Sequence, residues 1–283
     1  MTKILLAGAT GYLGGYILKE IEKSEYQNRI VVRNKSKLKS FPKLKSEIVL
    51  AEVTKPDTLR DICEGIDVVI STVGITKQKE GLTYLDVDYQ SNKNLLSEAL
   101  KRGVKKFVYV SVLNGERLKN LKICEAKERF VNELKSSGID YCIIRPNGFF
   151  SDMTEFYNMA KKGRIYLFGN GEHKANPIHG EDLAKIIMKN VETGVNEIKI
   201  GGPETLSQNQ IAEIAFKVLG KKIKTTYMPD CIRKSILSLV RTFMSSKIYG
   251  PIEFFLTVIA MDMVAPEYGN HTLKAYFENL KIK

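Results

Sequence analysis

Three glycines near the N-terminus have the spacing of a phosphate-binding turn. They stand in the stretch Gly8-Ala-Thr-Gly-Tyr-Leu-Gly14, directly after the apolar run Ile4–Ala7. Such glycines allow a tight bend, let backbone N–H groups approach a pyrophosphate, and let the next helix pack closely on its strand. The N-terminus of that helix adds unpaired N–H groups and a positive dipole end. We therefore expect a dinucleotide here, a purely structural turn being the alternative. The expected contacts are Gly8, Thr10, Gly11, Tyr12, Leu13 and Gly14.

An arginine stands where the second strand of such a fold would end. Arg33 comes nineteen residues after Gly14 and is followed by Lys35 and Lys37, with no acidic residue before Glu47. A site that prefers NAD usually has Asp or Glu here, to accept from the ribose 2′-hydroxyl. A carboxylate would repel a 2′-phosphate, whereas arginine can bind it with two charge-assisted hydrogen bonds. We expect NADP(H) to be preferred over NAD(H), with Arg33 and Lys37 as contacts; an exposed basic loop is the alternative.

Further cofactor contacts are expected at the carboxyl ends of later strands, where open α/β sheets bind ligands. Glu52 and Val53 would lie near the adenine, and the stretch that begins at Ser71 would lie by the phosphates and ribose. Each position could instead be ordinary loop. The later residues expected to contact the cofactor are Ser71, Thr72, Val73, Gly74 and Ser111.

The first half of the chain alternates short apolar runs with longer amphipathic segments, which is typical of a parallel sheet covered by helices. The expected strands are Ile4–Ala7, Arg29–Val32, Ile48–Leu50, Val68–Ser71, Phe107–Val110 and Tyr141–Ile144. The expected helices are Tyr12–Glu22, Asp57–Cys63, Tyr89–Lys101 and Lys122–Lys135. The pattern predicts an α/β fold with a Rossmann-type, doubly wound parallel sheet.

The regular alternation breaks down after Arg145-Pro146. The strands expected there are Arg164–Leu167, Glu197–Ile200 and Lys224–Tyr227, and the helices are Glu181–Val191, Gln208–Leu219, Cys231–Met244 and Ile252–Met261. We expect an NAD(P)-binding domain over residues 1–150 and a smaller C-terminal substrate lobe over residues 151–283, packed on it with a boundary that can interleave.

Composition excludes several classes of protein. The chain has 44 Lys and Arg against 32 Asp and Glu, a formal net charge of +12, and 43% hydrophobic residues. This mix is ordinary for a globular protein, and no apolar run approaches the ~20 residues of a membrane span. The basic residues alternate with acids and form no nucleic-acid-binding signature, so a solvated basic surface is expected. A strand pattern at the very start leaves no room for a signal peptide, which favours the cytoplasm.

Cysteines and histidines lack the spacing of a metal site. The residues concerned are Cys63, Cys124, Cys142, Cys231, His173, His179 and His271, with no CxxC pair and no HExxH pattern. We therefore expect neither a disulfide framework nor a bound metal. His179 and Asp182 are expected to orient a loop or begin the following helix.

Several further segments accompany the glycine turn. They are Val110-Ser111, Lys127, Gly138-Ile-Asp140, Ile144-Arg-Pro-Asn-Gly-Phe-Phe150 and Asn176-Pro-Ile-His-Gly-Glu-Asp-Leu-Ala184. Over residues 3–220 the chain resembles the short-chain dehydrogenase/reductase superfamily, in its atypical NmrA-like branch with isoflavone-reductase-like and triphenylmethane-reductase-like proteins. The resemblance implies an NAD(P)-binding Rossmann fold. It also implies cofactor contacts by Lys127, Pro146, Asn147 and Phe149.

The resemblance also implies a catalytic pair with a missing partner. Conventional members use a Ser, a Tyr-x-x-x-Lys pair and a helix Asn, and the tyrosine exchanges a proton with the substrate oxygen. Ser111 and Lys127 match the serine and lysine, but Ile123 stands at the tyrosine position and Asp88 at that of the Asn. Lys127 would hydrogen-bond the nicotinamide ribose, unless it is an ordinary surface lysine. Tyr109, Tyr141 and Tyr157 are weaker candidates for the missing acid.

The missing tyrosine narrows the chemistry. Alcohol oxidation needs a proton acceptor at the oxygen, whereas hydride transfer to a quinone, flavin, dye or conjugated double bond can take its proton from water. We therefore expect an NADPH-dependent reductase acting on a small apolar or aromatic acceptor. A non-catalytic NADP(H)-sensing regulator of NmrA type is the alternative, and a nucleotide-sugar epimerase or dehydratase is a second one.

Two apolar clusters in the second half have open roles. Phe150, Phe156 and Tyr157 follow the sixth strand and either bind the substrate or form the core that joins the lobes. A helical stripe near the C-terminus consists of Ile232, Ile236, Leu239, Val240 and Phe243. This stripe could pack as a core or lid, form a homodimer face, or rest on an anionic membrane surface. Packing is expected first and dimerisation second.

Overall fold

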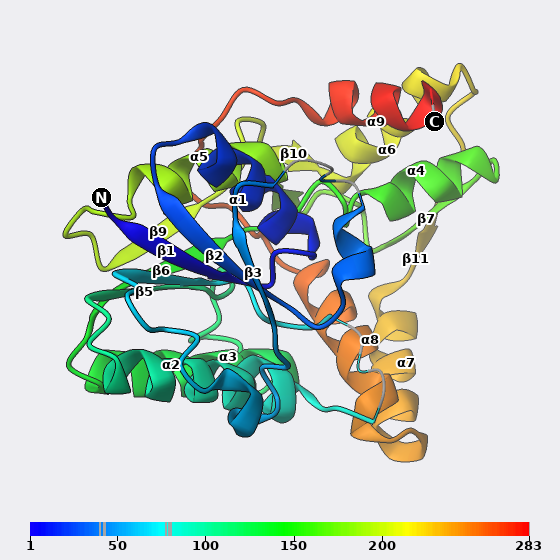
Figure 1. The fold of residues 1–283 in the computed structure, drawn as a ribbon. Coiled ribbons are helices and arrows are strands. Elements are labelled where there is room, and N and C mark those ends of the chain that lie inside the picture. The colour runs from blue at the N-terminus through cyan, green and yellow to red at the C-terminus, as the bar shows by residue number, and fades with distance from the viewer. Residues whose placement is uncertain (40, 42–43, 77, 79–80, 283) are drawn as a thin grey trace. The chain divides into compact units, whose positions relative to one another are not determined.

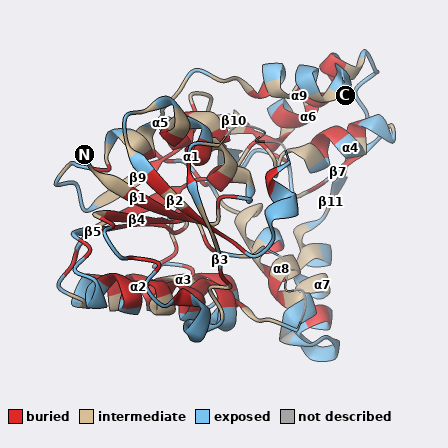
Figure 2. Cartoon of the chain, in the orientation of Figure 1, coloured by how far each residue is buried: buried red, intermediate tan, exposed pale blue. Residues whose placement is uncertain are grey.

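The N-terminal strands are apolar because both of their faces are buried. The computed structural model describes residues 1–39, 41, 44–76, 78 and 81–282. In strand β1 (Lys3–Ala7) the four residues after Lys3 are fully inaccessible to solvent. Strands β4 (Val68–Ser71) and β5 (Lys106–Val110) are also buried along their whole length (Figure 2). Strands with two buried faces are a property of parallel sheets that carry helices on both sides.

A seven-stranded sheet has the order β3-β2-β1-β4-β5-β6-β9. Its other strands are β2 (Gln27–Val32), β3 (Glu47–Leu50), β6 (Asp140–Pro146) and β9 (Glu197–Ile200). The pairs β1–β2, β2–β3, β1–β4, β4–β5 and β5–β6 are all parallel, with Leu5 beside Arg29 on one side and Val69 on the other. The predicted α/β class with a mostly parallel sheet is confirmed. The strand order reverses between β1 and β4, which is where such sheets bind ligands.

The helices lie on both sides of this sheet. Figure 1 shows α1 (Tyr12–Lys23) on one side and α2 (Ser91–Lys101) with α3 (Lys122–Ser136) on the other. A π-helical segment, η3 (Leu85–Gln90), leads into α2, and short 3₁₀ turns η1 (Lys35–Leu38) and η2 (Pro56–Leu59) lie between strands.

One predicted helix is wrong. Of the expected helix Asp57–Cys63, only the residues up to Leu59 are helical, as part of the 3₁₀ turn η2. The turn ends there because Arg60 has an extended ψ of 131° and Asp61 has a left-handed φ of 61°. A left-handed residue cannot continue a right-handed helix, so the helix ends there.

The remaining elements follow β6 along the chain. The helices are α4 (Thr154–Lys161), α5 (Gly180–Lys189), α6 (Gln208–Leu219), α7 (Asp230–Phe243), α8 (Ser246–Val258) and α9 (Leu273–Ile282). The strands are β7 (Ile165–Phe168), β8 (Lys174–Ala175), β10 (Leu206–Ser207) and β11 (Thr225–Met228), paired as β7–β11 and β8–β10. Among the helices formed by described residues, none has the length and apolar character to cross a membrane.

The described residues divide into two units. Unit 1 consists of Met1–Arg145 and Leu183–Ile198, and unit 2 of Pro146–Asp182 and Lys199–Lys283. Unit 2 has its own core, in which buried side chains of α4, α6 and α9 pack together. Helix α6 is well bounded, because Ser207 and Gln210 form a capping box at its start and Gly220 is left-handed at its end.

Candidate functional site

The glycine turn after β1 can be built only with glycines. Gly8 has a φ of +90°, and the N–H of Gly11 donates to the Gly8 carbonyl oxygen over 2.9 Å. A Cβ on Gly8 would overlap the Thr72 side chain, and one on Gly14 would overlap the Gly8 carbonyl. The first residues of α1 therefore lie directly against the end of β1 in the structure.

The start of α1 suits an anion. Gly11 is its N-cap and offers no side chain to the helix N–H groups, and the first turn holds no acidic residue. Thr10 and Gly11 are exposed, whereas Leu13 is buried in the core. A helix N-terminus without a side-chain cap or carboxylate provides N–H donors and a positive dipole end for a phosphate. The turn thus fits the pyrophosphate of a dinucleotide.

Arg33 has a carboxylate in its neighbourhood that the sequence did not assign to it. Arg33 and Lys37 are exposed after β2, and Glu52 follows the adjacent strand β3. The pKa of Glu52 lies below its ordinary value of 4.5 because Lys55 and Thr54 bind it, with a further lowering by the charge of Arg33. The Glu52 carboxylate and a ligand phosphate would therefore compete for the charge of Arg33. The nearby Val53 carbonyl accepts from Asn94 over 3.0 Å.

Residues after β4 face the glycine turn. Ser71 is buried and donates to the Asn92 side chain over 2.5 Å, and the Thr72 hydroxyl donates to the Ala7 carbonyl over 3.2 Å. Val73 is buried, whereas Gly74 is exposed. A Cβ on Gly74 would approach Asp88 and Lys127 to within 3 Å, so bare backbone is needed there.

Lys127 is not an ordinary surface lysine. Its Nζ lies 2.9 Å from the Asp88 carboxylate, and the two side chains are 12% and 0% exposed. Asp88 also accepts from the Ile75 N–H over 3.2 Å, and the π-helical turn of η3 carries it in the interior. Burial alone would lower the pKa of Lys127, but the Asp88 carboxylate outweighs it and raises that pKa above 10.5. Lys127 is therefore held charged and in one place.

The aromatic ring of Tyr109 lies beside the Lys127–Asp88 ion pair. Lys127 Nζ lies 5.7 Å from its ring centroid, and the side chain is fully buried. Its hydroxyl has no hydrogen-bond partner among the described residues, and burial raises its pKa above the ordinary value of 10.0. Ile123, at the position of the expected tyrosine, is 7% exposed and has no proton to exchange.

Ser111 belongs to a buried charge network in unit 1. Its hydroxyl donates to Glu128 over 3.2 Å, and Glu128 also binds the guanidinium of Arg145 at 2.5 and 3.0 Å. Arg145 is 1% exposed and binds Glu197 and Glu116 as well, at 3.0 and 3.2 Å. Burial alone would lower the pKa of Arg145, but the bond to Glu128 and the other acids raise it. The Ser111 hydroxyl is thus engaged within the protein.

The residues after β6 are mostly structural in unit 2. The Asn147 amide donates to the Asn176 side chain over 2.8 Å and to the Met263 carbonyl. Phe150, Phe156 and Tyr157 are 1%, 6% and 5% exposed and lie in the core with α6 and α9. Of the two roles left open for these three side chains, the structure shows the core, and their contact with a substrate stays a prediction. Pro146 is buried and Phe149 is half-buried.

Two histidines from distant segments meet in unit 2. The rings of His179 and His271 stack at 4.1 Å, and ligand atoms of these two and Glu181 lie within 4.8 Å of one another. The group could hold a metal ion, but the Nδ1 of His179 accepts from the Glu181 N–H over 3.3 Å. His271 Nδ1 lies 2.9 Å from Asp182. These contacts account for the cluster as a way to tie residue 271 to the start of α5, and the expectation of no metal stays a prediction.

The chain is similar to several known proteins. A family model described as NAD(P)H-binding matches residues 8–193. Divinyl chlorophyllide a 8-vinyl-reductase of Arabidopsis thaliana is 30% identical over 95% of this chain and 72% of that protein. Photosystem II assembly factor Ycf39 of Synechocystis is 24% identical over 85% of this chain and 75% of that protein.

Solved structures share the fold. The NADPH complex of the quinone oxidoreductase QOR2 from Escherichia coli superimposes with a TM-score of 0.73 at 18% identity, covering 98% of this chain and 99% of that one. A nucleoside-diphosphate-sugar epimerase from Staphylococcus aureus gives 0.73 at 16%, covering 98% and 100%.

Proposed function

Since the chain belongs to this NAD(P)H-binding family, we propose that it is an NADPH-dependent reductase whose acceptor is a small apolar or aromatic molecule. Within that class, a conjugated double bond on a flat aromatic system is the acceptor to test first. The relative from Arabidopsis is named for the reduction of a vinyl group, which is a bond of this kind.

The observation that carries the proposal is the ion pair of Lys127 and Asp88 against Gly74. Bound at the glycine turn, NADPH would supply the hydride. Lys127, charged and fixed by Asp88, would donate hydrogen bonds to the nicotinamide ribose beside the exposed backbone of Gly74. Fixing the donor before binding saves the cost of ordering it, so the protein contributes mainly orientation.

The residues at the position of the usual proton relay point to the same class of acceptor. Ile123 has no proton, and the hydroxyl of Ser111 is bound to Glu128. A carbon–carbon double bond accepts hydride at one carbon and takes a proton from water at the other, which requires no acid of the protein. Epimerisation at a sugar oxygen would need a base there, so these residues disfavour it.

The preference for NADPH is a part of this proposal. Arg33 is exposed after β2 and can bind a 2′-phosphate, while Glu52 competes for its charge. We expect Arg33→Ala to weaken NADPH binding about 10-fold, the cost of a charged hydrogen bond, and to leave NADH binding unchanged. Lys35→Ala, which removes a neighbouring exposed cation, is the matched control. Titration calorimetry with both cofactors measures the difference, and a wild-type preference for NADH would contradict the assignment.

Turnover is tested by NADPH oxidation with a panel of quinones, flavins, dyes and vinyl-substituted aromatic compounds. We expect at least one class to be reduced, and Lys127→Met to lower kcat at least about 100-fold, as loss of a charged positioning contact does. Lys122→Met on the same helix is the control, because Lys122 is exposed and lies 2.9 Å from Glu125, away from Asp88. Tight NADPH binding without oxidation by any acceptor would instead favour the cofactor-sensing regulator.

A further inference from the structure

The α7–α8 hairpin of unit 2 carries a concentration of exposed apolar side chains. Of sixteen large apolar residues that are exposed in the described ranges, six lie between residues 232 and 255. They are Ile232, Leu239, Phe243, Met244, Ile248 and Phe255. Single exposed apolar residues are normal on a protein surface, but a group of them marks a place of contact.

This exposure contradicts the packed role expected first for the α7 stripe. Helix α7 buries one side chain, Val240, while Leu239 is 56% and Phe243 80% exposed. Helix α8 is the main packing partner of α7. The stripe therefore turns Leu239 and Phe243 to solvent.

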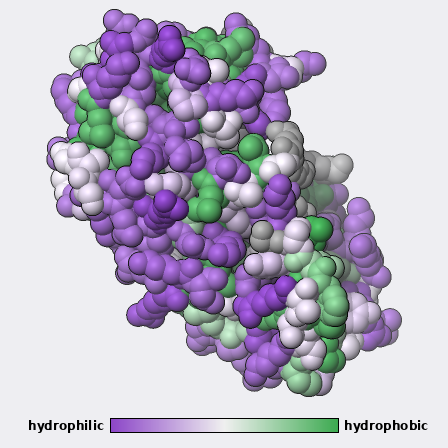
Figure 3. All heavy atoms as spheres, turned by 90° about the horizontal axis from the view of Figure 1, so that it is seen from below, coloured by the Kyte–Doolittle hydropathy of each residue, from purple (hydrophilic) through white to green (hydrophobic). Residues whose placement is uncertain are grey.

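The apolar residues are densest where the two helices connect. We call residues 241–248 the hairpin tip. Phe243, Met244 and Ile248 are 80%, 43% and 56% exposed there, and the cations Arg241 and Lys247 stand among them. Figure 3 shows apolar side chains gathered beside polar ones at its lower right. Aromatic and aliphatic side chains mixed with cations suit the boundary between lipid headgroups and acyl chains.

The charge of the hairpin is positive. Residues 230–258 contain four cations (Arg233, Lys234, Arg241 and Lys247) against two carboxylates (Asp230 and Glu253). Both acids are paired within the hairpin: Glu253 lies 2.5 Å from Arg241, and Asp230 lies 2.6 Å from Arg233 and 3.2 Å from Lys234. The hairpin therefore keeps an excess of two cations over acids.

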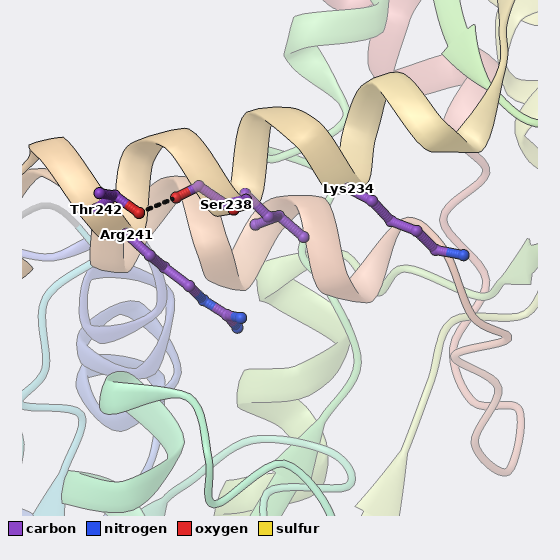
Figure 4. Close-up of a pocket in the computed structure, with 5 residues that line it drawn as sticks. Lys234, Ser238, Arg241 and Thr242 are labelled. Carbon is purple, nitrogen blue, oxygen red and sulfur yellow. Dashed lines mark hydrogen bonds between the residues drawn. The ribbon is translucent and has the colours of Figure 1, made fainter.

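A hollow of about 420 Å³ on α7 adds polar groups of the right kind. It is lined by Lys234, Leu237, Ser238, Arg241 and Thr242, and Figure 4 shows the two cations reaching out from either side of Ser238 along the helix. The Thr242 hydroxyl donates its proton to the Ser238 carbonyl over 2.9 Å, so the donors that the hollow offers to an anion are mainly the two cations. Ammonium and guanidinium groups beside hydroxyls are the donors that bind a phosphate.

We propose that the hairpin tip docks this chain onto the surface of a membrane that contains anionic phospholipid. Phe243, Met244 and Ile248 enter the boundary of headgroups and acyl chains, while Lys234, Arg241 and Lys247 contact lipid phosphates. A second copy of the chain is a poorer occupant, because it would bring the same positive hairpin and the same net charge of +12. The proposal is independent of the reductase activity.

Vesicle sedimentation tests the docking. The full chain is mixed with vesicles of phosphatidylcholine alone or of phosphatidylcholine with phosphatidylglycerol. We expect sedimentation with the anionic vesicles and not with the neutral ones. Phe243→Asp should weaken it about 10-fold or more, through the lost apolar burial. Lys247→Gln should weaken it about 5-fold, as expected for one cation at an anionic surface, and added salt should weaken it further.

The control is Ile223→Asp, which places the same charge at an apolar side chain 53% exposed in unit 2 but outside the hairpin. It should sediment like the wild type, and all variants should keep the wild-type circular dichroism. Failure of the wild type to sediment with either vesicle would overturn the proposal, as would unchanged binding of Phe243→Asp or equal binding to neutral vesicles. A dimer in light scattering that Phe243→Asp dissociates, without vesicle binding, would assign the tip to a second copy.

Discussion

At the scale of single residues, the site depends on charges that the fold has already paired. Lys127 and Asp88 come from different helical elements and meet 2.9 Å apart, where one carboxylate holds one ammonium next to Gly74. A buried ion pair adds little to stability as a whole, but removing one partner leaves the other charge uncompensated. This asymmetry makes the pair testable apart from any activity.

We expect Asp88→Asn to destabilise the fold by about 2–4 kcal/mol, because it leaves the Lys127 ammonium without its carboxylate. Lys127→Met should cost a similar amount, and the double variant less than the two together. Urea denaturation of the four proteins measures the coupling. Additive losses would contradict a direct interaction.

The sequence predicts a site residue when local spacing along the chain defines its role, and not when its partners come from distant segments. The glycine turn and Lys127 are visible in the sequence because their spacing along the chain is local. The partners of Arg145 are not, because tertiary packing brings Glu128 from helix α3 and Glu197 from strand β9 to its guanidinium. An Arg-Pro pair at a strand end gives no sign of which acids neutralise the arginine. The burial of Phe150, Phe156 and Tyr157 was equally hidden, since an apolar residue can face either a ligand or a core.

At the scale of elements, the β1 turn and α1 act as one unit. Gly14 lies against the Gly8 carbonyl, whereas the next residue, Gly15, has room: a Cβ there would meet Phe41 at 3.6 Å and the Ala9 carbonyl oxygen at 3.8 Å. A side chain at Gly14 would therefore clash with the backbone, whereas one at Gly15 would fit.

We expect Gly14→Ala to abolish NADPH binding and to cost about 1–3 kcal/mol of stability, because α1 must move from the strand. Gly15→Ala should bind NADPH normally and gain about 0.5–1 kcal/mol, because alanine restricts the unfolded chain. Calorimetry and denaturation of both variants provide the check. Normal NADPH binding by Gly14→Ala would show that the turn is not the site.

The Glu22 carboxylate binds the residues directly before β3 to α1. Glu22 accepts from the N–H groups of Lys45 and Ser46 over 2.8 and 3.1 Å, and from the Ser46 hydroxyl. Burial alone would raise the pKa of Glu22, but the hydrogen bonds from Ser46 and Lys45 outweigh it and lower that pKa below 4.5.

A carboxyl group whose pKa is lower in the folded state than in the unfolded state stabilises the fold at pH values above its unfolded-state pKa. This stabilisation is lost as the pH falls through the folded-state pKa. We therefore expect Glu22→Gln to cost roughly 1–2 kcal/mol at neutral pH and almost nothing in acid well below the ordinary value of 4.5. Glu20→Gln on the same helix, which loses an exposed pair with Lys23, should change little at either pH. A pH-independent loss for Glu22→Gln would exclude the ionised contact as its cause.

Elements with strong periodicity were predictable, and those fixed by tertiary contacts were not. The six strands expected in the first half are present, as is α6 at the predicted residues Gln208–Leu219. Helices α4 and α9 escaped prediction because they are short, with 8 and 10 residues, and because their apolar residues gain their partners only in the core of unit 2. The expected helix Asp57–Cys63 was wrong because Asp61 has a left-handed φ, which an aspartate in the sequence does not predict.

At the scale of the whole molecule, net charge and cofactor act together. The chain carries +12 and the proposed cofactor is an anion, so NADPH should bind more weakly as salt rises. We also expect NADPH at about 100 times its Kd to stabilise the fold by roughly 2.7 kcal/mol, seen as a raised Tm. Gly15→Ala should show the same rise and Gly14→Ala none. A Tm unmoved by NADPH in the wild type would count against the site.

The chain order of the sheet bears on how the molecule is made. Strand β9 extends the sheet beside β6, yet 50 residues that begin at Asn147 separate it from the end of β6 at Pro146, and most of them belong to unit 2. On the ribosome, the sheet therefore stays one strand short while part of the second unit is already emerging. Arg145 must wait as well, because its partner Glu197 arrives with that last strand. A nascent chain arrested before residue 197 would expose the edge of β6 and would leave Arg145 with Glu128 and Glu116 but without Glu197. An unpaired strand edge of this kind favours aggregation, which chaperones prevent.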